Sequence, residues 1–441
     1  MIEPFAASRR RFLGATGAAF AALAASGCVV RRSTDTRTVG YGPLREDPVG
    51  LLDLPAGFSY RVLSRLGDAM DDGARVPDKA DGMGCFRLRD GRIVLVRNHE
   101  LRIGEEGGGY AGLAYDATTA GGILPGGTTT LVLDPRTLAV ERQFRSLAGT
   151  IRNCAGGVTP WGSWLSCEED VTCIGTRGAT RNHGWVFEVP AAATGPVEPR
   201  PLTALGRFNH EAAAVDPASG IVYLTEDRDD SLLYRFLPTR PSRLGDGGRL
   251  QALALHDVAS MDSRNWTAPG LARNAWMEVR WIDLDGVESP DDDLRKRGHA
   301  AGALRFARGE GIAMGDGELY FMCTSGGAAK LGQIFRLRFG AGSDKLQLFF
   351  ESTDPSQLNY GDNLTVAPDG QLIVCEDQYT DVVDNHLRGI GLDGVPYPLA
   401  RLREQTELAG ACFSPDGRTL FVNVLSPART LAISGPWHHL G

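Results

Sequence analysis

Acidic residues recur in this sequence directly after short apolar runs. They stand in the segments NHE (98–100), CEED (167–170), TED (225–227) and CED (375–377). If these runs are equivalent strands around one axis, their ends converge and bring the acids of four segments together. Carboxylates packed that closely raise one another's pKa values unless a bound cation compensates their charge. The spacing therefore predicts a metal centre, with solvated acids at strand ends as the alternative.

A cysteine and an arginine add to this chemistry. Cys154 stands in NCAGG, where small residues let the backbone bend close to a ligand. Hard oxygen ligands select calcium or magnesium, whereas a thiolate favours a softer transition metal. Arg308 and Glu310 lie between glycines in FARGEGIAM, and a guanidinium group beside a metal-binding acid suits an anionic substrate such as phosphate. Further candidates elsewhere in the chain are Asp81, His210, Glu211, Asp362 and Asn363.

A repeated turn-and-strand pattern must position these residues. Six times, a turn with Gly, Pro or Asp precedes a β-branched and aromatic run, at residues 89–100, 159–170, 216–229, 315–327, 367–378 and 414–426. The turns are typical of β-turns and the runs of strands. Several strands in each repeat and no helical period predict an all-β fold, a six-bladed β-propeller with loop insertions over residues 49–441. A large β-sandwich enzyme is the alternative, and it explains the repeat less well.

The net charge and the absence of common catalytic motifs argue against several classes of function. The chain has 441 residues and a net charge of −8, which argues against nucleic acid as a partner. It contains no GxSxG nucleophile motif, no HExxH zinc helix and no phosphate-binding P-loop. The surplus of acids leaves carboxylates available for cations.

The N-terminus reads as an export signal. Residues 1–28 combine the basic head of Arg9–Arg11 with a short Ala-rich stretch, which predicts a signal peptide of the twin-arginine type. The sequence AASGC ends at Cys28, which is either a lipoprotein processing site or close to an ordinary cleavage site. Residues 29–48 are polar and predict a linker. The protein is therefore expected in the periplasm or outside the cell, free or as a membrane-anchored lipoprotein.

Eight cysteines include an odd number outside the signal peptide. An odd count in an exported protein means that at least one thiol is unpaired, buried or a ligand. Cys167 and Cys173 are close enough in sequence for a local disulfide, although Cys167 also suits a core position. Cys323, Cys375 and Cys412 are expected as small core residues on buried strands.

Several long motifs resemble the PhoX family of alkaline phosphatases. They are RVPDKADGM with VRNHE, LAGTIRNCAGGVTPWGSWLSCEED, GRFNHEAAAVDPASGIVYLTEDR, RGEGIAM and CEDQ, in family order from about Leu51 to Ser426. The resemblance implies a six-bladed propeller that holds two bridged ferric ions with two or three calcium ions beside them. By motif, Cys154 resembles the iron-binding cysteine, Glu211 and Glu310 resemble metal-binding glutamates, and Arg308 resembles the arginine that faces phosphate. The further ligands implied are Glu168, Glu169, Glu226, Asp227, Glu376, Asp377, Asp81, Asn98 and Glu100.

The implied reaction is hydrolysis of small-molecule phosphate monoesters outside the cytoplasm, with Arg308 and Glu310 as catalytic residues. The twin-arginine export machinery would be a partner, and the enzyme is expected to be a monomer. Two other classes stay open. One is a calcium-dependent lactonase or esterase, which leaves Cys154 unexplained. The other is a non-catalytic propeller that binds a partner through its rim.

Overall fold

Antiparallel strands make up nearly all the regular structure of the computed structural model, which describes residues 40–267, 270–378 and 380–437. These residues belong to the unit Val39–Gly441. The predicted signal peptide, Cys28 and residues 29–39 lie outside the described residues. The rest of the predicted linker contains strand β1 (Leu44–Arg45), which pairs with β2 (Leu52–Pro55).

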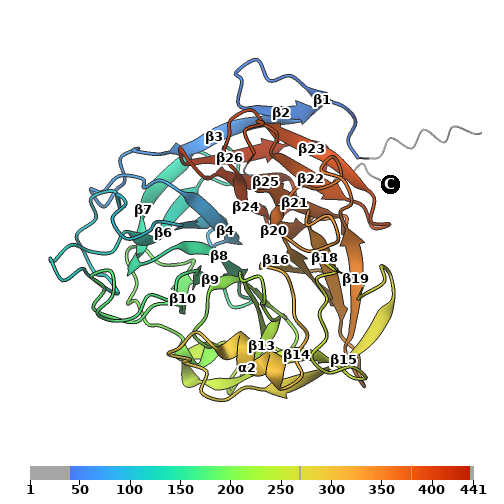
Figure 1. Ribbon diagram of the computed structural model, residues 1–441. Helices are drawn as coiled ribbons and strands as arrows, with labels where there is room; N and C mark the ends of the chain where they lie inside the picture. Colours follow the sequence, from blue (N-terminus) through green and yellow to red (C-terminus); the bar gives the residue numbers. More distant parts are fainter. Residues whose placement is uncertain (1–39, 268–269, 379, 438–441) are drawn as a thin grey trace, which may run out of the picture. The chain divides into compact units, whose positions relative to one another are not determined.

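Most strands form meanders of segments that are consecutive in the chain (Figure 1). The first three meanders are β4 (Ala80–Arg87), β5 (Ile93–His99), β6 (Gly126–Leu133) and β7 (Val140–Thr150); β8 (Asn153–Val158), β9 (Ser163–Glu168) and β10 (Val186–Pro190); and β11 (His210–Val215), β12 (Val222–Glu226), β13 (Tyr234–Pro238) and β14 (Gly248–Leu255). The next three are β16 (Gly309–Met314), β17 (Glu318–Cys323), β18 (Gln333–Arg338) and β19 (Lys345–Glu351); β20 (Gly361–Val366), β21 (Leu372–Glu376), β22 (His386–Ile390) and β23 (Pro396–Leu402); and β24 (Leu408–Phe413), β25 (Thr419–Val424) and β26 (Arg429–Ser434) with β3 (Ser59–Arg65). Strand β15 (Trp276–Asp283) joins β14 to β19, so two meanders share one nine-stranded sheet.

The first strands of the meanders surround a common centre. Each contacts the first strand of the next meander, in the order β4, β8, β11, β16, β20, β24 and back to β4. Figure 1 shows β4, β8, β16, β20 and β24 nearest the middle of the ring. Strand β3 from the start of the unit pairs with β26 from its end, which closes the ring. The prediction of an all-β, propeller-like fold is confirmed.

Tight turns connect the first two strands of a meander. In the segment APDG, the N–H of Gly370 bonds the carbonyl of Ala367 at 2.8 Å, and Gly370 has φ of 86°. Pro at the second position and Gly at the fourth favour such a turn, because Pro presets φ and Gly accepts a positive φ. In SPDG, Gly417 repeats the bond to Ser414 at 2.8 Å. The sequence signal of the repeat is therefore a local turn preference.

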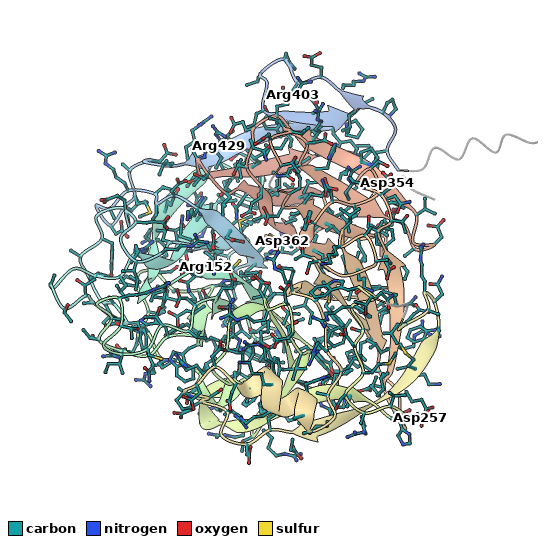
Figure 2. All side chains as sticks on the ribbon, viewed as in Figure 1. Arg152, Asp257, Asp354, Asp362, Arg403 and Arg429 are labelled. Carbon is teal, nitrogen blue, oxygen red and sulfur yellow. The ribbon has the colours of Figure 1, made fainter. Side chains whose placement is uncertain are left out.

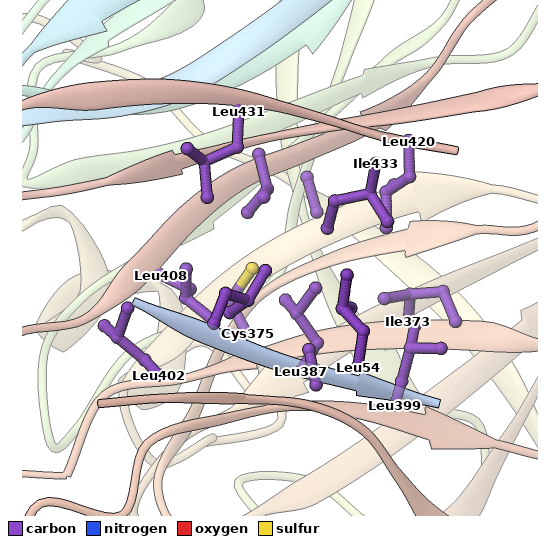
Figure 3. Packing of buried hydrophobic residues seen from close by; sticks show 14 of the residues in the cluster. Leu54, Ile373, Cys375, Leu387, Leu399, Leu402, Leu408, Leu420, Leu431 and Ile433 are labelled. Carbon is purple, nitrogen blue, oxygen red and sulfur yellow. The ribbon is translucent and has the colours of Figure 1, made fainter. Parts of the chain in front are cut away.

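The hydrophobic core lies between neighbouring sheets. Figure 3 shows one cluster, in which leucines and isoleucines of β2 and of the β20–β23 meander pack against those of β25 and β26. Cys375 is fully buried in this cluster, and Cys323 is fully buried in another. Both core predictions are confirmed, and Cys412 packs partly buried against a third cluster.

The proposed Cys167–Cys173 disulfide is absent, since both residues are free cysteines. Cys167 is fully buried in the core. The sulfur of Cys173 instead accepts a hydrogen bond from Arg207 Nη2 at 3.2 Å.

Helix α2 (Leu294–Ala300) has seven residues. Among the described residues, no helix has the length and apolar character that a membrane crossing requires.

Candidate metal centre

Five possible metal ligands occupy equivalent positions in five meanders. Each is the second residue of a first strand, at the point where a β-bulge shifts the pairing with the second strand, and they are Asp81, Cys154, Glu211, Glu310 and Asp362. A bulge inserts an extra residue into one strand and changes the direction of its side chain. All five residues are buried, and all line one cavity at the centre of the ring.

A second set of acids follows the second strands. Glu100, Glu169, Asp227 and Asp377 stand one residue after those strands and line the same cavity. Their backbone N–H groups bond the carbonyl groups of the residues that precede the first strands, which are Lys79, Arg152, Asn209 and Tyr360. This repeated hydrogen bond holds each acid at an equivalent place beside the first set.

The glutamates one residue earlier in the chain do not reach the cavity. Glu168, Glu226 and Glu376 are the last residues of β9, β12 and β21, and all three are fully buried. Neighbouring side chains of a strand point to opposite faces, so these carboxylates point away from the acids that follow them. Their hydrogen-bond partners are His183, Tyr234 and Arg388, at 2.6, 2.7 and 2.7 Å respectively.

Asn98 also lies outside the cavity, but it acts on the strand that carries Cys154. Its Nδ2 donates to the carbonyl oxygens of Cys154 at 3.0 Å and of Ala155 at 2.7 Å. Its Oδ1 accepts a bond from Trp164 Nε1 at 2.9 Å. Asn98 therefore positions the backbone of Cys154, and its side chain is fully occupied in doing so.

The ligand atoms gather into four overlapping groups. Within each group the atoms lie within 4.8 Å of one another, and the groups are Cys154–Glu169–Glu211, Asp81–Glu100–Glu407, Glu211–Glu310–Asp362 and Asp362–Asp377–Glu407. The sulfur of Cys154 lies 3.3 Å from Asp81 Oδ2 and 3.3 Å from Glu211 Oε1. Because the groups share members, cations bound to them would be neighbours.

Burial and mutual repulsion make this arrangement costly without a cation. Burial raises the pKa of Glu211 and Glu310 well above the usual value, and the neighbouring carboxylates raise it further. Burial, followed by the charge of Asp377, raises the pKa of Asp362 to about 7. The Oδ1 atoms of Asp81 and Asp362 are buried without a hydrogen-bond partner. Bound cations would satisfy these oxygens, so the residues fit a multinuclear metal centre.

Small residues let the strands come close enough for the ligands to meet. The positions after the ligands in four meanders are Gly82, Ala155, Ala212 and Gly311. A Cβ atom on Gly82 would lie 2.5 Å from Cα of Ala155, and one on Gly311 would lie 2.5 Å from the nitrogen of Leu364. A side chain at position 82 or 311 would therefore force neighbouring strands apart.

Two arginines stand at the edge of the cavity. Arg308 binds Asp227 through Nε at 2.7 Å and Nη2 at 3.0 Å, and Nη2 lies 3.2 Å from Glu310. Arg152 Nη2 lies 2.7 Å from Glu100 and 2.5 Å from Glu169. Figure 2 shows Arg152 and Asp362 near the middle of the ring.

Both arginines have left-handed backbone conformations, with φ of 45° for Arg152 and 49° for Arg308. Lys79 and Tyr360, which also directly precede first strands, have the same conformation, with φ of 52° and 54°, so it is a repeated feature of this position. The ion pairs with acids hold the two guanidinium groups beside the carboxylates.

The sequence reading missed two residues of this cavity. Glu407 directly precedes the first strand of the last meander, and Arg152 and Arg308 directly precede the first strands of two other meanders. Arg152 stands two residues before Cys154, as Arg308 stands two residues before Glu310. Aligning the repeats on their first strands, in place of their second strands, would have found both.

Fold and cavity together define a propeller-like all-β protein with an acidic, cysteine-containing cavity at its centre whose residues could hold metal ions. The model of the PhoX alkaline phosphatase family matches residues 39–137 and 135–428. The chain belongs to the PhoX family of alkaline phosphatases, which are phosphoric monoester hydrolases. No curated protein sequence matches the chain.

A solved structure shows a related fold. The structure of Pseudomonas fluorescens PhoX in complex with vanadate, a transition state analogue, has a TM-score of 0.65 and 18% identity, and the match covers 88% of this chain and 96% of that one. A gluconolactonase from Xanthomonas campestris has a TM-score of 0.39 and 15% identity over 90% of this chain and 98% of that one. The second similarity is too weak to bear on function.

Proposed function

We propose that the protein hydrolyses phosphate monoesters outside the cytoplasm at an iron and calcium centre, with release of inorganic phosphate. The observation that carries this proposal is the sulfur of Cys154 among buried carboxylates, in a cavity edged by Arg308. Membership of the PhoX family supports the reaction. The vanadate that Pseudomonas fluorescens PhoX binds is described as a transition state analogue, which supports phosphoryl chemistry in a related fold.

The chemistry of the ligands supports a division between the metals. The group Cys154–Glu169–Glu211 contains a thiol and suits iron, since thiolates favour softer metals. The other three groups contain oxygen ligands alone and suit calcium. We propose two ferric ions near Cys154 and two or three calcium ions among the remaining carboxylates.

The protein's own residues would bind and orient the ester. Metal ions in the cavity would act as Lewis acids on the phosphoryl group and activate water. Arg308, held on two sides by Asp227 and Glu310, would bind the phosphoryl oxygens and stabilise the negative charge that develops on them. Arg152, held by Glu100 and Glu169, offers a second guanidinium group at the cavity.

We also propose that the six meanders are six blades, with loop insertions, and that the enzyme acts as a monomer. The closed ring of first strands and the repeated backbone bond before each of them support the blade number. The basic head before Phe12 supports export by the twin-arginine machinery to the periplasm or the outside of the cell. Lipid attachment at Cys28 would anchor the enzyme to a membrane.

One experiment separates this function from its two alternatives. The protein is produced with its own export signal, iron and calcium are measured by elemental analysis, and hydrolysis of 4-nitrophenyl phosphate and of a lactone is assayed. We expect both metals and turnover of the phosphate ester. Calcium without iron, together with lactone hydrolysis, would indicate the lactonase, and neither metal nor turnover would indicate a binding module.

Variants of two buried cysteines test the role of the thiol. Cys154→Ala should lose iron and phosphatase activity together. Cys323→Ala is the matched control, because Cys323 is also a buried cysteine but lies in the hydrophobic core. It is the last residue of its strand, as Glu168 and Glu226 are of theirs. Iron and activity retained in Cys154→Ala would refute the role proposed for Cys154.

A further inference from the structure

A second cavity adjoins the metal centre. It has a volume of about 450 Å³, within the range of small-molecule sites, and it shares Arg152 and Glu169 with the acidic cavity. Its walls come from the segment after β9, residues 170–177, and from Arg228 after β12. Asn209 lies between the two cavities, where its Nδ2 donates to Glu169 Oε1 at 2.9 Å.

Three arginines give this cavity a chemistry opposite to that of the metal centre. Arg152, Arg177 and Arg228 line it, with the acids Glu169 and Asp170. Arg177 pairs with Asp170 through Nη1 at 2.9 Å, and its side chain is 63% exposed. Arg228 reaches Asp292 only at 3.4 Å. Because Arg177 is exposed and exposed ion pairs contribute little stability, its guanidinium group can exchange its partner for a ligand at low cost. Arg228 is one-third exposed, and its long contact with Asp292 leaves it able to turn toward a ligand.

The backbone and the free donors of Arg177 are compatible with ligand binding. Arg177 has φ of 52°, in the left-handed region that Arg152 and Arg308 also occupy. Strained backbone at non-glycine residues clusters at ligand-binding sites. A guanidinium group has five N–H donors in a planar fork, and the pair with Asp170 uses the Nη1 nitrogen. Arg177 therefore retains donors that suit a carboxylate or phosphate group.

We propose that this second cavity, here named the arginine subsite, binds a second anionic group carried by the leaving group of the phosphate ester. The proposal rests on the proposed phosphatase function. With the scissile phosphoryl group between Arg308 and the carboxylate cluster, the leaving group would pass Arg152 and place its anion between Arg177 and Arg228. The preferred substrates are phosphate monoesters whose leaving group bears a carboxylate or a further phosphate.

A matched pair of esters tests the arginine subsite. The metal-loaded enzyme is assayed with 3-carboxyphenyl phosphate and 3-carbamoylphenyl phosphate, which have nearly the same size and differ in charge. We expect kcat/KM to be about tenfold higher for the carboxylate at low ionic strength, and salt to reduce the preference. In the double variant Arg177→Gln, Arg228→Gln, the ratio of the two kcat/KM values should fall to about one.

Binding gives a second readout that needs no turnover. The corresponding phosphonates, which are not hydrolysed, are titrated calorimetrically, and the preference for the carboxylate should again disappear in the double variant. Arg338→Gln is the matched control, because Arg338 is an exposed arginine that pairs with Glu318 on β17. It should keep the wild-type ratio.

The outcomes separate the two proposals. Equal kcat/KM values for both esters in the wild type, or a preference that survives in the double variant, would overturn the arginine subsite and leave the phosphatase function standing. Hydrolysis of neither ester by the metal-loaded enzyme would overturn the phosphatase function and the subsite with it.

Discussion

Replacement of Asp362 by Asn should stabilise the metal-free protein at pH 8 while it abolishes metal binding. Asp362 is buried, its Oδ1 has no hydrogen-bond partner, and it belongs to two of the four ligand groups. Its pKa is about 7, compared with an ordinary 3.8, because burial and the charge of Asp377 disfavour the ionised form. Asn keeps the shape of the side chain and removes the charge.

The sign and size follow from proton linkage. Because the folded protein binds the proton of Asp362 more tightly than the unfolded protein does, stability is lost as the pH rises from 3.8 to about 7. A difference of about three pH units corresponds to about 4 kcal/mol at 1.36 kcal/mol per unit. The side chains of Asp362 and Glu310 share a hydrogen bond, and its weakening in the Asn variant would offset about 1 kcal/mol of this gain. The Asn variant should therefore be about 3 kcal/mol more stable than the wild type at pH 8.

The assay is urea denaturation of chelator-treated protein at several values between pH 4 and pH 8. The wild type should lose stability relative to Asp362→Asn across this range. At pH 4 the variant should be about 1 kcal/mol less stable than the wild type, because only the weakened hydrogen bond acts there. Asp257→Asn is the control, because the side chain of Asp257 is 90% exposed, and it should follow the wild type. A metal-free Asp362→Asn protein that is less stable than the wild type at pH 8 would refute the reasoning.

Three further variants test the positions of other residues. Asp227→Asn should lower kcat/KM for phosphate esters about tenfold, because it removes a charged hydrogen bond to Arg308. Such a bond contributes about 1.5–3 kcal/mol, and the one-third exposure of Arg308 places the effect at the lower end. Unchanged steady-state kinetics would contradict the role of Asp227 in orienting Arg308. Glu376→Gln should destabilise the fold by about 3 kcal/mol and leave iron content intact, because it breaks a buried pair with Arg388; urea denaturation and elemental analysis distinguish this from loss of a ligand. Asn98→Ala should reduce iron content with little change in circular dichroism, because the backbone of Cys154 loses two hydrogen bonds, and full iron occupancy would exclude that positioning role.

Much of the fold could be predicted because its signals are local. The turns APDG and SPDG occur where the sequence places them, since Pro and Gly set backbone angles independently of distant residues. The apolar runs after those turns form strands, as their β-branched and aromatic residues predict. The pairing of β3 with β26 joins residues far apart in the chain, and no local signal marks it.

For the candidate site, too, some features are visible in the sequence and others depend on contacts between distant segments. The residue types, a thiol and many acids at strand ends, are visible in the sequence and predict a metal centre by their chemistry alone. The choice within each pair of adjacent acids is not visible, because it depends on the register that sends Glu169 into the cavity and Glu168 into the sheet. Glu407 and Arg152 line the cavity because they stand directly before first strands, which come together only in the folded ring. The sequence by itself therefore determined the strands, the turns and the donor chemistry, whereas strand register, β-bulges and ring closure decided which donors meet, since those depend on contacts between distant segments.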